Sequence, residues 1–302
     1  MIKRNQIRIL FYLLLVVFIF SACSGDLPQS DDPFVLATTT IVGDVASQIG
    51  GELMEVRVLL PPDVDPHSFQ PTPQDLVAIE QAELVLTNGF GLEEFLGEMI
   101  EDTASADKIV EVSLGVSPIY FGENADKHGV DPHVWMSPLN VVVWVENIAS
   151  ALAELDPVHT AEYQANAQAY QEELEDLHNW ALDQFDLVPE DQRLLVADHE
   201  TFNYLARAYG FDVVGALTGF SSLAESSAQE LAALEDAIMD LGVPAIFVST
   251  TVPPGLAEQV AEDTGIKVVR VYTGSLSAED GPAANYIELL RNTISLMVDA
   301  LR

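Results

Sequence analysis

The sequence predicts an α/β fold of two similar lobes with parallel sheets, joined by one long rigid backbone helix and separated by a cleft. Three observations predict this fold. Short apolar runs alternate with helical stretches from Phe34 onward, the same rhythm resumes after Arg193, and the segment between them contains no glycine or proline over Glu162–Asp186. With 302 residues, the chain is also near the size at which one hydrophobic core gives way to two.

In the first lobe, residues 34–155, short apolar runs are the strand candidates and the amphipathic stretches between them are the helix candidates. Strands are expected at Phe34–Thr39, Met54–Leu60, Leu84–Thr87 and Ile109–Val112. Helices are expected at Ile41–Ile49, Thr72–Gln81 and Leu92–Asp102, with another beginning near Ser137–Asn140.

The linking segment, residues 156–190, is predicted to be one long amphipathic helix. Asp156 suits the N-cap and Pro157 suits the first helical position. Apolar positions then recur in steps of three and four, at Tyr163, Ala167, Tyr170, Leu174, Leu177, Ala181 and Phe185. About 30 residues at 1.5 Å per residue would span roughly 45 Å, enough to run along both lobes. Such a helix predicts modest lobe closure, and its two histidines, His159 and His178, are expected to be solvated.

The second lobe, residues 191–302, repeats the pattern of the first. Strands are expected at Leu194–Ala197, Asp212–Gly215, Ala245–Val248 and Lys267–Tyr272. Helices are expected at Phe202–Tyr209, Ala228–Leu241, Gly255–Asp263 and Ala284–Leu301.

Residues 1–22 have the pattern of a secretory signal peptide. A basic start precedes the apolar run Ile9–Phe20, and Ser-Ala stands directly before Cys23, the only cysteine. This ending resembles the lipobox of bacterial lipoproteins, so Cys23 is the expected lipidated residue and residues 23–33 the tether. The alternative is an uncleaved anchor helix, although the run is shorter than the roughly 20 residues that span a bilayer. Either interpretation places the chain in the cell envelope, at the outer face of the cytoplasmic membrane or in the periplasm.

The composition excludes several classes of function. Asp and Glu number 48 against 12 Lys and Arg, which gives a formal net charge of −36 and no basic footprint for nucleic acid. Once Cys23 carries lipid, no thiol remains for a disulfide, a cysteine-bound zinc or a cysteine nucleophile. A bound metal would therefore use histidine or carboxylate ligands. The acidic surface suits a cationic ligand, although a solvated surface is the simpler interpretation.

Three histidines share the same neighbourhood, because each has an aspartate one or two residues upstream: Asp65-Pro66-His67, Asp131-Pro132-His133 and Asp198-His199. Proline restricts its own backbone and that of the preceding residue, so both Asp-Pro-His tripeptides should lie in ordered loops. Loops beyond the carboxyl ends of parallel strands line the ligand crevice of open α/β sheets. Neutral imidazoles suit Zn, Cu, Ni or Fe, with the carboxylates orienting them through the second ring nitrogen. By spacing alone, three unrelated loop histidines remain an equal alternative.

Several longer motifs carry a resemblance that covers nearly the whole mature region. They are ATTTIVGDVASQIGG, LLPPDVDPHSFQPTPQDL, NGFGLEEFL, DPHVWMSPLN, DHETFNYLARAYGF, AEQVAEDTG and the closing NYIELLRNTISLMVDALR. Together they resemble the zinc/manganese-type solute-binding lipoproteins of metal ABC transporters. The resemblance implies that His67, His133 and His199 bind the metal in the cleft between the lobes. It also implies that a third histidine ligand favours Zn²⁺, with Mn²⁺ or Fe²⁺ as alternatives.

Two positions depart from that family's pattern. The family commonly supplies a fourth ligand as Asp in a TDS turn, where YTGSLS places Gly274, and it often has Glu where this chain has Ser249. The fourth position is therefore expected to hold water or a loop carboxylate. The candidate carboxylates are Glu279, Asp280 and Glu225. His128, in place of the family's His-rich loop, is expected to be solvated.

The resemblance predicts an extracytoplasmic receptor that delivers its metal to an ABC permease and its ATPase subunit, acts as a monomer and catalyses no reaction. Two other classes of function are alternatives. A zinc hydrolase is disfavoured because HETFN has Asn203 where a zinc-peptidase helix needs its second histidine, although Glu200 could act as a general base. An adhesin-like lipoprotein would need only the exposed fold and no metal.

Overall fold

The computed structural model describes residues 33–96, 106–121, 129–219, 222–223 and 226–302, and Pro33–Arg302 form one compact unit. The predicted signal peptide, Cys23, His128 and Glu225 lie outside the described residues. In the part that is described, none of the helices combines the length and apolar character needed to cross a bilayer.

The first sheet is parallel, with strand order β2-β1-β3-β4. The central strands β1 and β3 are buried along their whole length, as expected for apolar runs covered on both faces. All four predicted strands are confirmed, three of them one or more residues shorter than expected: β1 Phe34–Ala37, β2 Glu55–Val58, β3 Leu84–Thr87 and β4 Ile109–Glu111.

The second sheet repeats the same topology. Its order is β6-β5-β7-β8, so each sheet places its first strand between its second and third, and all pairs are parallel. The strands are β5 Leu194–Ala197, β6 Asp212–Ala216, β7 Ala245–Ser249 and β8 Lys267–Val271. The predicted fold class, two similar α/β lobes with parallel sheets, is thereby confirmed.

The helices outside the linking segment begin and end close to their predicted bounds, because residues that favour helix caps stand at their ends in the sequence. Thr72 and Ser227 form capping boxes with Asp75 and Glu230, so each satisfies backbone N–H groups of the first turn. Of the helix predicted over Leu92–Asp102, only the residues up to 96 are described. The helices are α2 Thr40–Gly50, α3 Pro73–Gln81, α6 Pro138–Leu155, α8 Asn203–Tyr209, α9 Ala228–Leu241, α10 Gly255–Thr264 and α11 Tyr286–Leu301.

The linking helix α7 runs over Thr160–Phe185, 26 residues, or roughly 39 Å of rise. The seven residues of its predicted apolar face are the seven that are buried. The helical conformation begins at Pro157 as predicted, but Pro157–His159 form a short 3₁₀ turn and the α-helix itself begins at Thr160. The Asp156 side chain makes no N-cap hydrogen bond; its Oδ2 instead contacts His159 Nδ1 at 2.6 Å and accepts a hydrogen bond from the Tyr163 hydroxyl at 3.0 Å.

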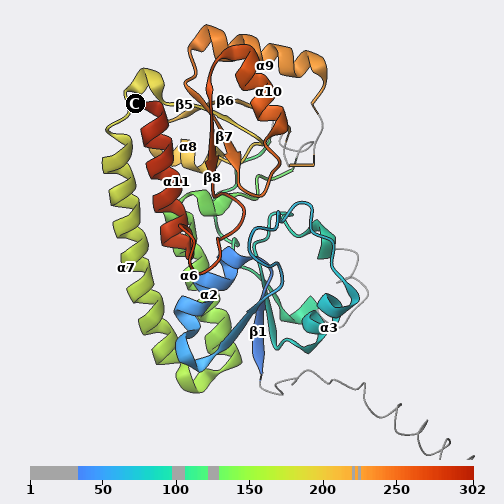
Figure 1. Cartoon of the computed structure of the whole chain (residues 1–302). Coiled ribbons are helices and arrows are strands. Elements are labelled where there is room, and N and C mark those ends of the chain that lie inside the picture. Colours follow the sequence, from blue (N-terminus) through green and yellow to red (C-terminus); the bar gives the residue numbers. More distant parts are fainter. Residues whose placement is uncertain (1–32, 97–105, 122–128, 220–221, 224–225) are drawn as a thin grey trace, which may run out of the picture. The chain divides into compact units, whose positions relative to one another are not determined.

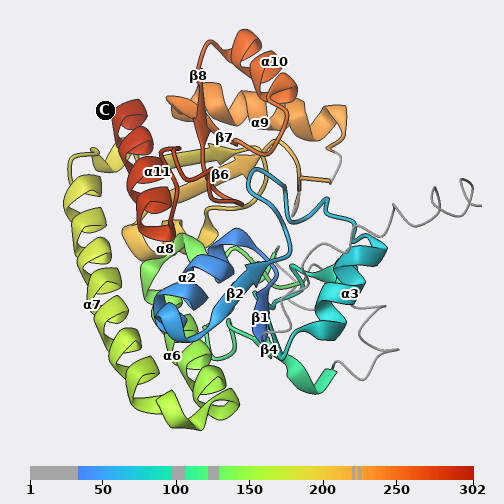
Figure 2. The ribbon, with the colours of Figure 1, turned by 60° about the horizontal axis from the view of Figure 1, so that its bottom comes forward.

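Figures 1 and 2 show α7 alongside both sheets, together with α6 and α11, which also pack against it. One continuous cluster of buried residues includes Val35 of the first sheet, Leu195 of the second, and Leu174 of α7. The lobes are therefore linked in the chain by the one long helix α7, as predicted, and they also share a core with the helices packed beside it. His178 lies beside that packing, because its Nδ1 is 3.1 Å from the Tyr209 hydroxyl, so it is half-buried and only partly solvated. The boundaries at 155/156 and 190/191 stay predictions.

Candidate metal centre

The three Asp-His loops follow elements of both lobes. His67 lies in the loop between β2 and α3, and His199 follows β5 by two residues. His133 directly precedes the 3₁₀ turn Val134–Met136, which leads into α6. The loops after β2 and β5 leave the carboxyl ends of their sheets, where parallel strands deliver ligand-binding residues.

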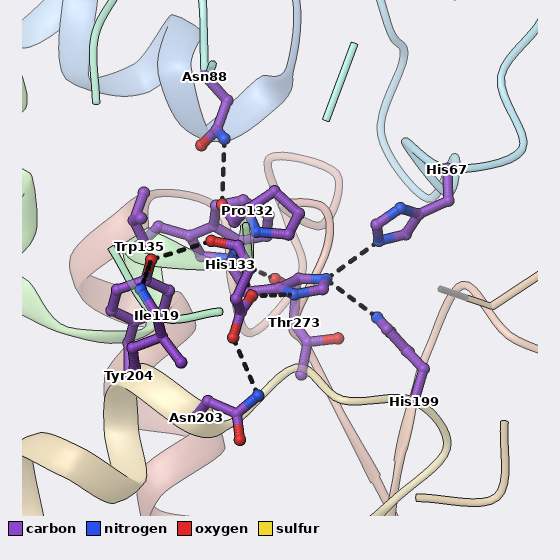
Figure 3. Close-up of polar contacts among 12 residues, drawn as sticks. His67, Asn88, Ile119, Pro132, His133, Trp135, His199, Asn203, Tyr204 and Thr273 are labelled. Carbon is purple, nitrogen blue, oxygen red and sulfur yellow. Dashed lines mark hydrogen bonds and ion pairs between the residues drawn. The ribbon is translucent and has the colours of Figure 1, made fainter. Parts of the chain in front are cut away.

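The side chains of the three histidines meet (Figure 3). His133 Nε2 lies 3.0 Å from His67 Nε2 and 3.1 Å from His199 Nε2, and one ring nitrogen from each residue lies within 4.8 Å of the others. Residues separated by 66 positions in sequence thus form one cluster. The alternative of three unrelated loop histidines is thereby excluded.

All three imidazoles are removed from water to different degrees. His133 and His199 are 1% and 4% exposed, and His67 is half-buried. Burial, reinforced by the neighbouring His133 and His199, lowers the pKa of His67 to about 2. Burial also lowers the pKa of His133, against the opposing effect of Asp131. Both rings are therefore neutral at pH 7, the form in which imidazole binds metals.

Two aspartates fix which ring nitrogen carries the proton. His133 Nδ1 lies 2.8 Å from Asp131 Oδ1, and His199 Nδ1 lies 3.2 Å from Asp198 Oδ1. Because a carboxylate only accepts hydrogen bonds, each Nδ1 is the donor, and in the neutral form of each ring Nε2 therefore carries a lone pair. The two lone pairs face each other across 3.1 Å. This arrangement is repulsive by itself and favourable once a cation lies between the nitrogens.

The backbone of each histidine is held in the same way. Asp131 Oδ1 also accepts the His133 N–H at 2.9 Å, and Asp198 Oδ1 accepts the His199 N–H at 3.0 Å. For His67, Asp65 Oδ1 accepts the backbone N–H at 3.1 Å, while its other oxygen accepts a hydrogen bond from the Ser222 hydroxyl. The sequence prediction that the aspartates orient the rings holds for two of the three, since Asp65 holds only the backbone of His67.

The loop of His133 is also anchored from the second lobe. Asn203 Nδ2 donates to Asp131 Oδ2 at 3.0 Å, and the Tyr204 hydroxyl donates to the Asp131 carbonyl at 2.9 Å. Sequence reasoning missed Asn203, which it noted only where the peptidase motif fails. No local pattern marks it, because its partner is 72 residues away. Trp135 adds a further link, its Nε1 donating to the Thr273 carbonyl at 2.6 Å.

The positions considered for a fourth ligand do not complete the cluster. Glu279 and Asp280 are exposed, and neither joins the only group of three or more candidate ligands in the described parts of the chain. A Cβ on Gly274 would lie 3.3 Å from Pro66 Cδ, beside the His67 loop. Ser249 is turned to other partners: its hydroxyl lies 2.8 Å from that of Thr251, and its N–H donates to Asp198. Glu279 and Asp280 therefore do not join the three histidines in this structure, and a water molecule at the fourth position stays a prediction.

Comparison with known proteins shows which family this chain belongs to. The profile of the ZnuA family, described as zinc-uptake complex component A, periplasmic, matches residues 35–300. The chain belongs to this family. The manganese-binding lipoprotein MntA of Halalkalibacterium halodurans is 34% identical over 296 residues, covering 96% of this chain and 97% of that protein. The iron-binding protein YfeA of Yersinia pestis is 35% identical over 261 residues, 86% of this chain and 83% of its own length.

Solved structures of ZnuA-like proteins share the fold. The periplasmic zinc binding protein TroA from Treponema pallidum superposes with a TM-score of 0.84 at 27% identity, covering 89% of this chain and 99% of TroA. The Mn-bound periplasmic metal binding protein from Candidatus Liberibacter asiaticus gives 0.80 at 31% identity, covering 90% and 100%.

As a ZnuA-family member, the chain is a metal-binding, extracytoplasmic solute-binding protein of an ABC importer and not an enzyme. The structure adds a second reason to set aside the hydrolase alternative. The HETFN segment is not helical as a zinc-peptidase motif requires, because α8 begins only at Asn203.

Proposed function

We propose that this protein captures Zn²⁺ through His67, His133 and His199 and delivers it to the membrane permease of its importer. The observation that carries the proposal is the convergence of three imidazole nitrogens, with His133 Nε2 3.0 and 3.1 Å from its neighbours. An ion bound there as cargo would replace the repulsion between facing lone pairs with three coordinate bonds. Zinc sites with three protein nitrogens and a fourth, exchangeable position are common.

The choice of zinc rests on the chemistry of the donor atoms. Imidazole suits zinc, copper, iron and nickel, whereas manganese favours carboxylate, carbonyl and water oxygens. Within the described residues, no carboxylate joins the three histidines, and glycine occupies position 274. The aspartates behind the ligands are negative and hydrogen-bonded to them, so they attract a cation without coordinating it.

Manganese or iron is the second candidate for the cargo. This candidate is favoured by the names of two relatives, a manganese-binding lipoprotein and an iron-binding protein, which are 34% and 35% identical to this chain over their matched lengths. The fourth position decides between the candidates, because an oxygen ligand there would favour manganese more than water alone does.

The remaining parts of the proposal concern partners and anchoring. A lipid at Cys23 would hold the protein at the envelope, as the lipoprotein names of several relatives suggest, and the permease and ATPase of the importer would be its partners. We expect a monomer in solution. The adhesin-like role stays an untested alternative.

Competitive loading tests the choice of metal. The metal-stripped protein is offered equimolar Zn²⁺, Mn²⁺ and Fe²⁺ without oxygen, and the bound metals are counted by elemental analysis. We expect one ion per chain, predominantly zinc, because affinity at an imidazole site rises along the series from manganese through iron to zinc. Predominant manganese would contradict the assignment of zinc and point to an oxygen ligand outside the three histidines.

A further inference from the structure

A buried carboxylate lies outside the candidate ligands and has no role in the function proposed above. Glu93 is 9% exposed and accepts three hydrogen bonds. Its Oε1 accepts from the Thr38 hydroxyl and from the Asn88 N–H, both at 2.7 Å, and its Oε2 accepts from the Gly89 N–H at 3.1 Å. The group therefore ties together the segments that leave the carboxyl ends of β1 and β3.

The loop that Glu93 closes has an unusual backbone. Gly89, Phe90 and Gly91 have φ values of 86°, 55° and 81°, so three consecutive residues lie in the left-handed region. Phe90 adopts this region at a cost that its neighbours must offset, since side chains with a Cβ rarely do so. The backbone N–H groups of Asn88 and Gly89 both donate hydrogen bonds to the Glu93 carboxylate and so hold the start of this turn in place.

The Asn88 side chain connects this loop to the loop of His133 by hydrogen bonds. It is fully buried, and its Nδ2 donates to the Gly89 carbonyl at 2.8 Å and to the Pro132 carbonyl at 3.0 Å (Figure 3). Two carbonyl acceptors fix the orientation of the amide, because only its nitrogen can donate to them. Pro132 directly precedes His133, so the hydrogen bond acts one residue from the central imidazole.

We propose that Asn88, held in place by Glu93, is a positioning residue for His133. The inference rests on the proposed role of His133 as a metal ligand. In this arrangement the His133 loop is fixed from both lobes, by Asn88 at Pro132 and by Asn203 at Asp131. Ligand groups need to stay within about 0.5 Å of the productive geometry, which requires such supporting hydrogen bonds around them.

The test uses Co²⁺ as a spectroscopic substitute for zinc, because its visible absorption depends on coordination geometry. In Asn88→Asp, a carboxylate oxygen replaces the donor and faces two carbonyl oxygens, so the His133 loop should move. We expect a changed Co²⁺ spectrum and an affinity about 10- to 100-fold weaker, the range for lost supporting contacts at metal sites. Asn88→Ala, which removes the donor without adding a repulsive oxygen, should change both in the same direction and serves if Asn88→Asp does not fold.

Glu93→Gln tests the link behind Asn88. The glutamine keeps the acceptor for Thr38 and Asn88 but turns an NH₂ group toward the Gly89 N–H, so we expect a smaller change of the same kind. Thr87→Val is the matched control. Thr87 is buried one residue before Asn88, and its hydroxyl donates only to the Val110 carbonyl, at 3.4 Å, so this variant should keep the wild-type spectrum and affinity.

The outcomes separate this inference from the proposed function. Folded Asn88 and Glu93 variants with the wild-type spectrum and affinity, and only a lower melting temperature, would overturn the positioning role. If His133→Ala binds Co²⁺ as well as the wild type does, the proposed function itself fails. A changed spectrum in the Asn88 variants, with an unchanged spectrum in Thr87→Val, supports the inference.

Discussion

Replacement of His133 by alanine is expected to weaken Zn²⁺ binding by more than about 100-fold, beyond the usual cost of losing a supporting contact at a metal site. His133 is the central member of the cluster, because its Nε2 is within 3.1 Å of both other imidazoles. Its loss leaves His67 and His199 as a two-nitrogen site. Isothermal titration of the metal-stripped variant, with circular dichroism to verify the fold, measures the effect.

His178→Ala provides the matched control for that experiment. His178 is a half-buried histidine whose ring contacts the Tyr209 hydroxyl, and it lies on α7 and outside the cluster. We expect its removal to leave zinc affinity unchanged. If His133→Ala kept wild-type affinity, the three-histidine site would be refuted, whatever the control showed.

The second large effect is expected from Asp131→Asn. Asp131 is fully buried, accepts both the N–H and the Nδ1–H of His133 through one oxygen, and accepts from Asn203 through the other. An amide has only one accepting oxygen, so one of these two sides must face an NH₂ group. We expect a 10- to 100-fold loss of zinc affinity, about the range measured when the carboxylate behind a ligating histidine is altered.

Competition against a fluorescent zinc chelator measures this loss, and Asp156→Asn is the control. Asp156 also pairs with a histidine Nδ1, at 2.6 Å to His159, but that pair lies outside the cluster, at the start of the linking segment. A full-affinity Asp131→Asn variant would show that the carboxylate serves folding alone and does not support the ligand.

The sequence predicted the elements whose signals are local. The seven buried residues of α7 were identified by their spacing alone, because a helix of 3.6 residues per turn repeats its buried face in steps of three and four. The strands followed from short apolar runs, which are typical of parallel strands covered on both faces. The Asp-His pairs indicated the candidate ligands because a carboxylate can orient a neighbouring imidazole, and the resemblance to metal receptors favoured these histidines over unrelated loop residues.

Features that depend on competing or distant partners could not be predicted in this way. Asp156 has the right residue type for an N-cap, but its carboxylate is used by His159 and Tyr163 instead. The supporting residues Asn88 and Asn203 act on partners 44 and 72 residues away. No spacing rule connects such pairs, because the approach of the two loops is set by the packing of both lobes.

The helix layer between the lobes bears on how the protein would release its cargo. The buried cluster is continuous from one sheet through α7 to the other, so a wide opening of the lobes would break packed core contacts. Capture and release by small movements of the loops around His67, the most exposed of the three histidines, fits this architecture better than a wide hinge motion.

The most direct test of the central claim is anomalous scattering at the zinc absorption edge from crystals grown with Zn²⁺. We expect one strong peak per chain among the side chains of His67, His133 and His199, at about 2.0–2.1 Å from one nitrogen of each. A zinc peak elsewhere on the acidic surface, with no peak among these imidazoles, would contradict it.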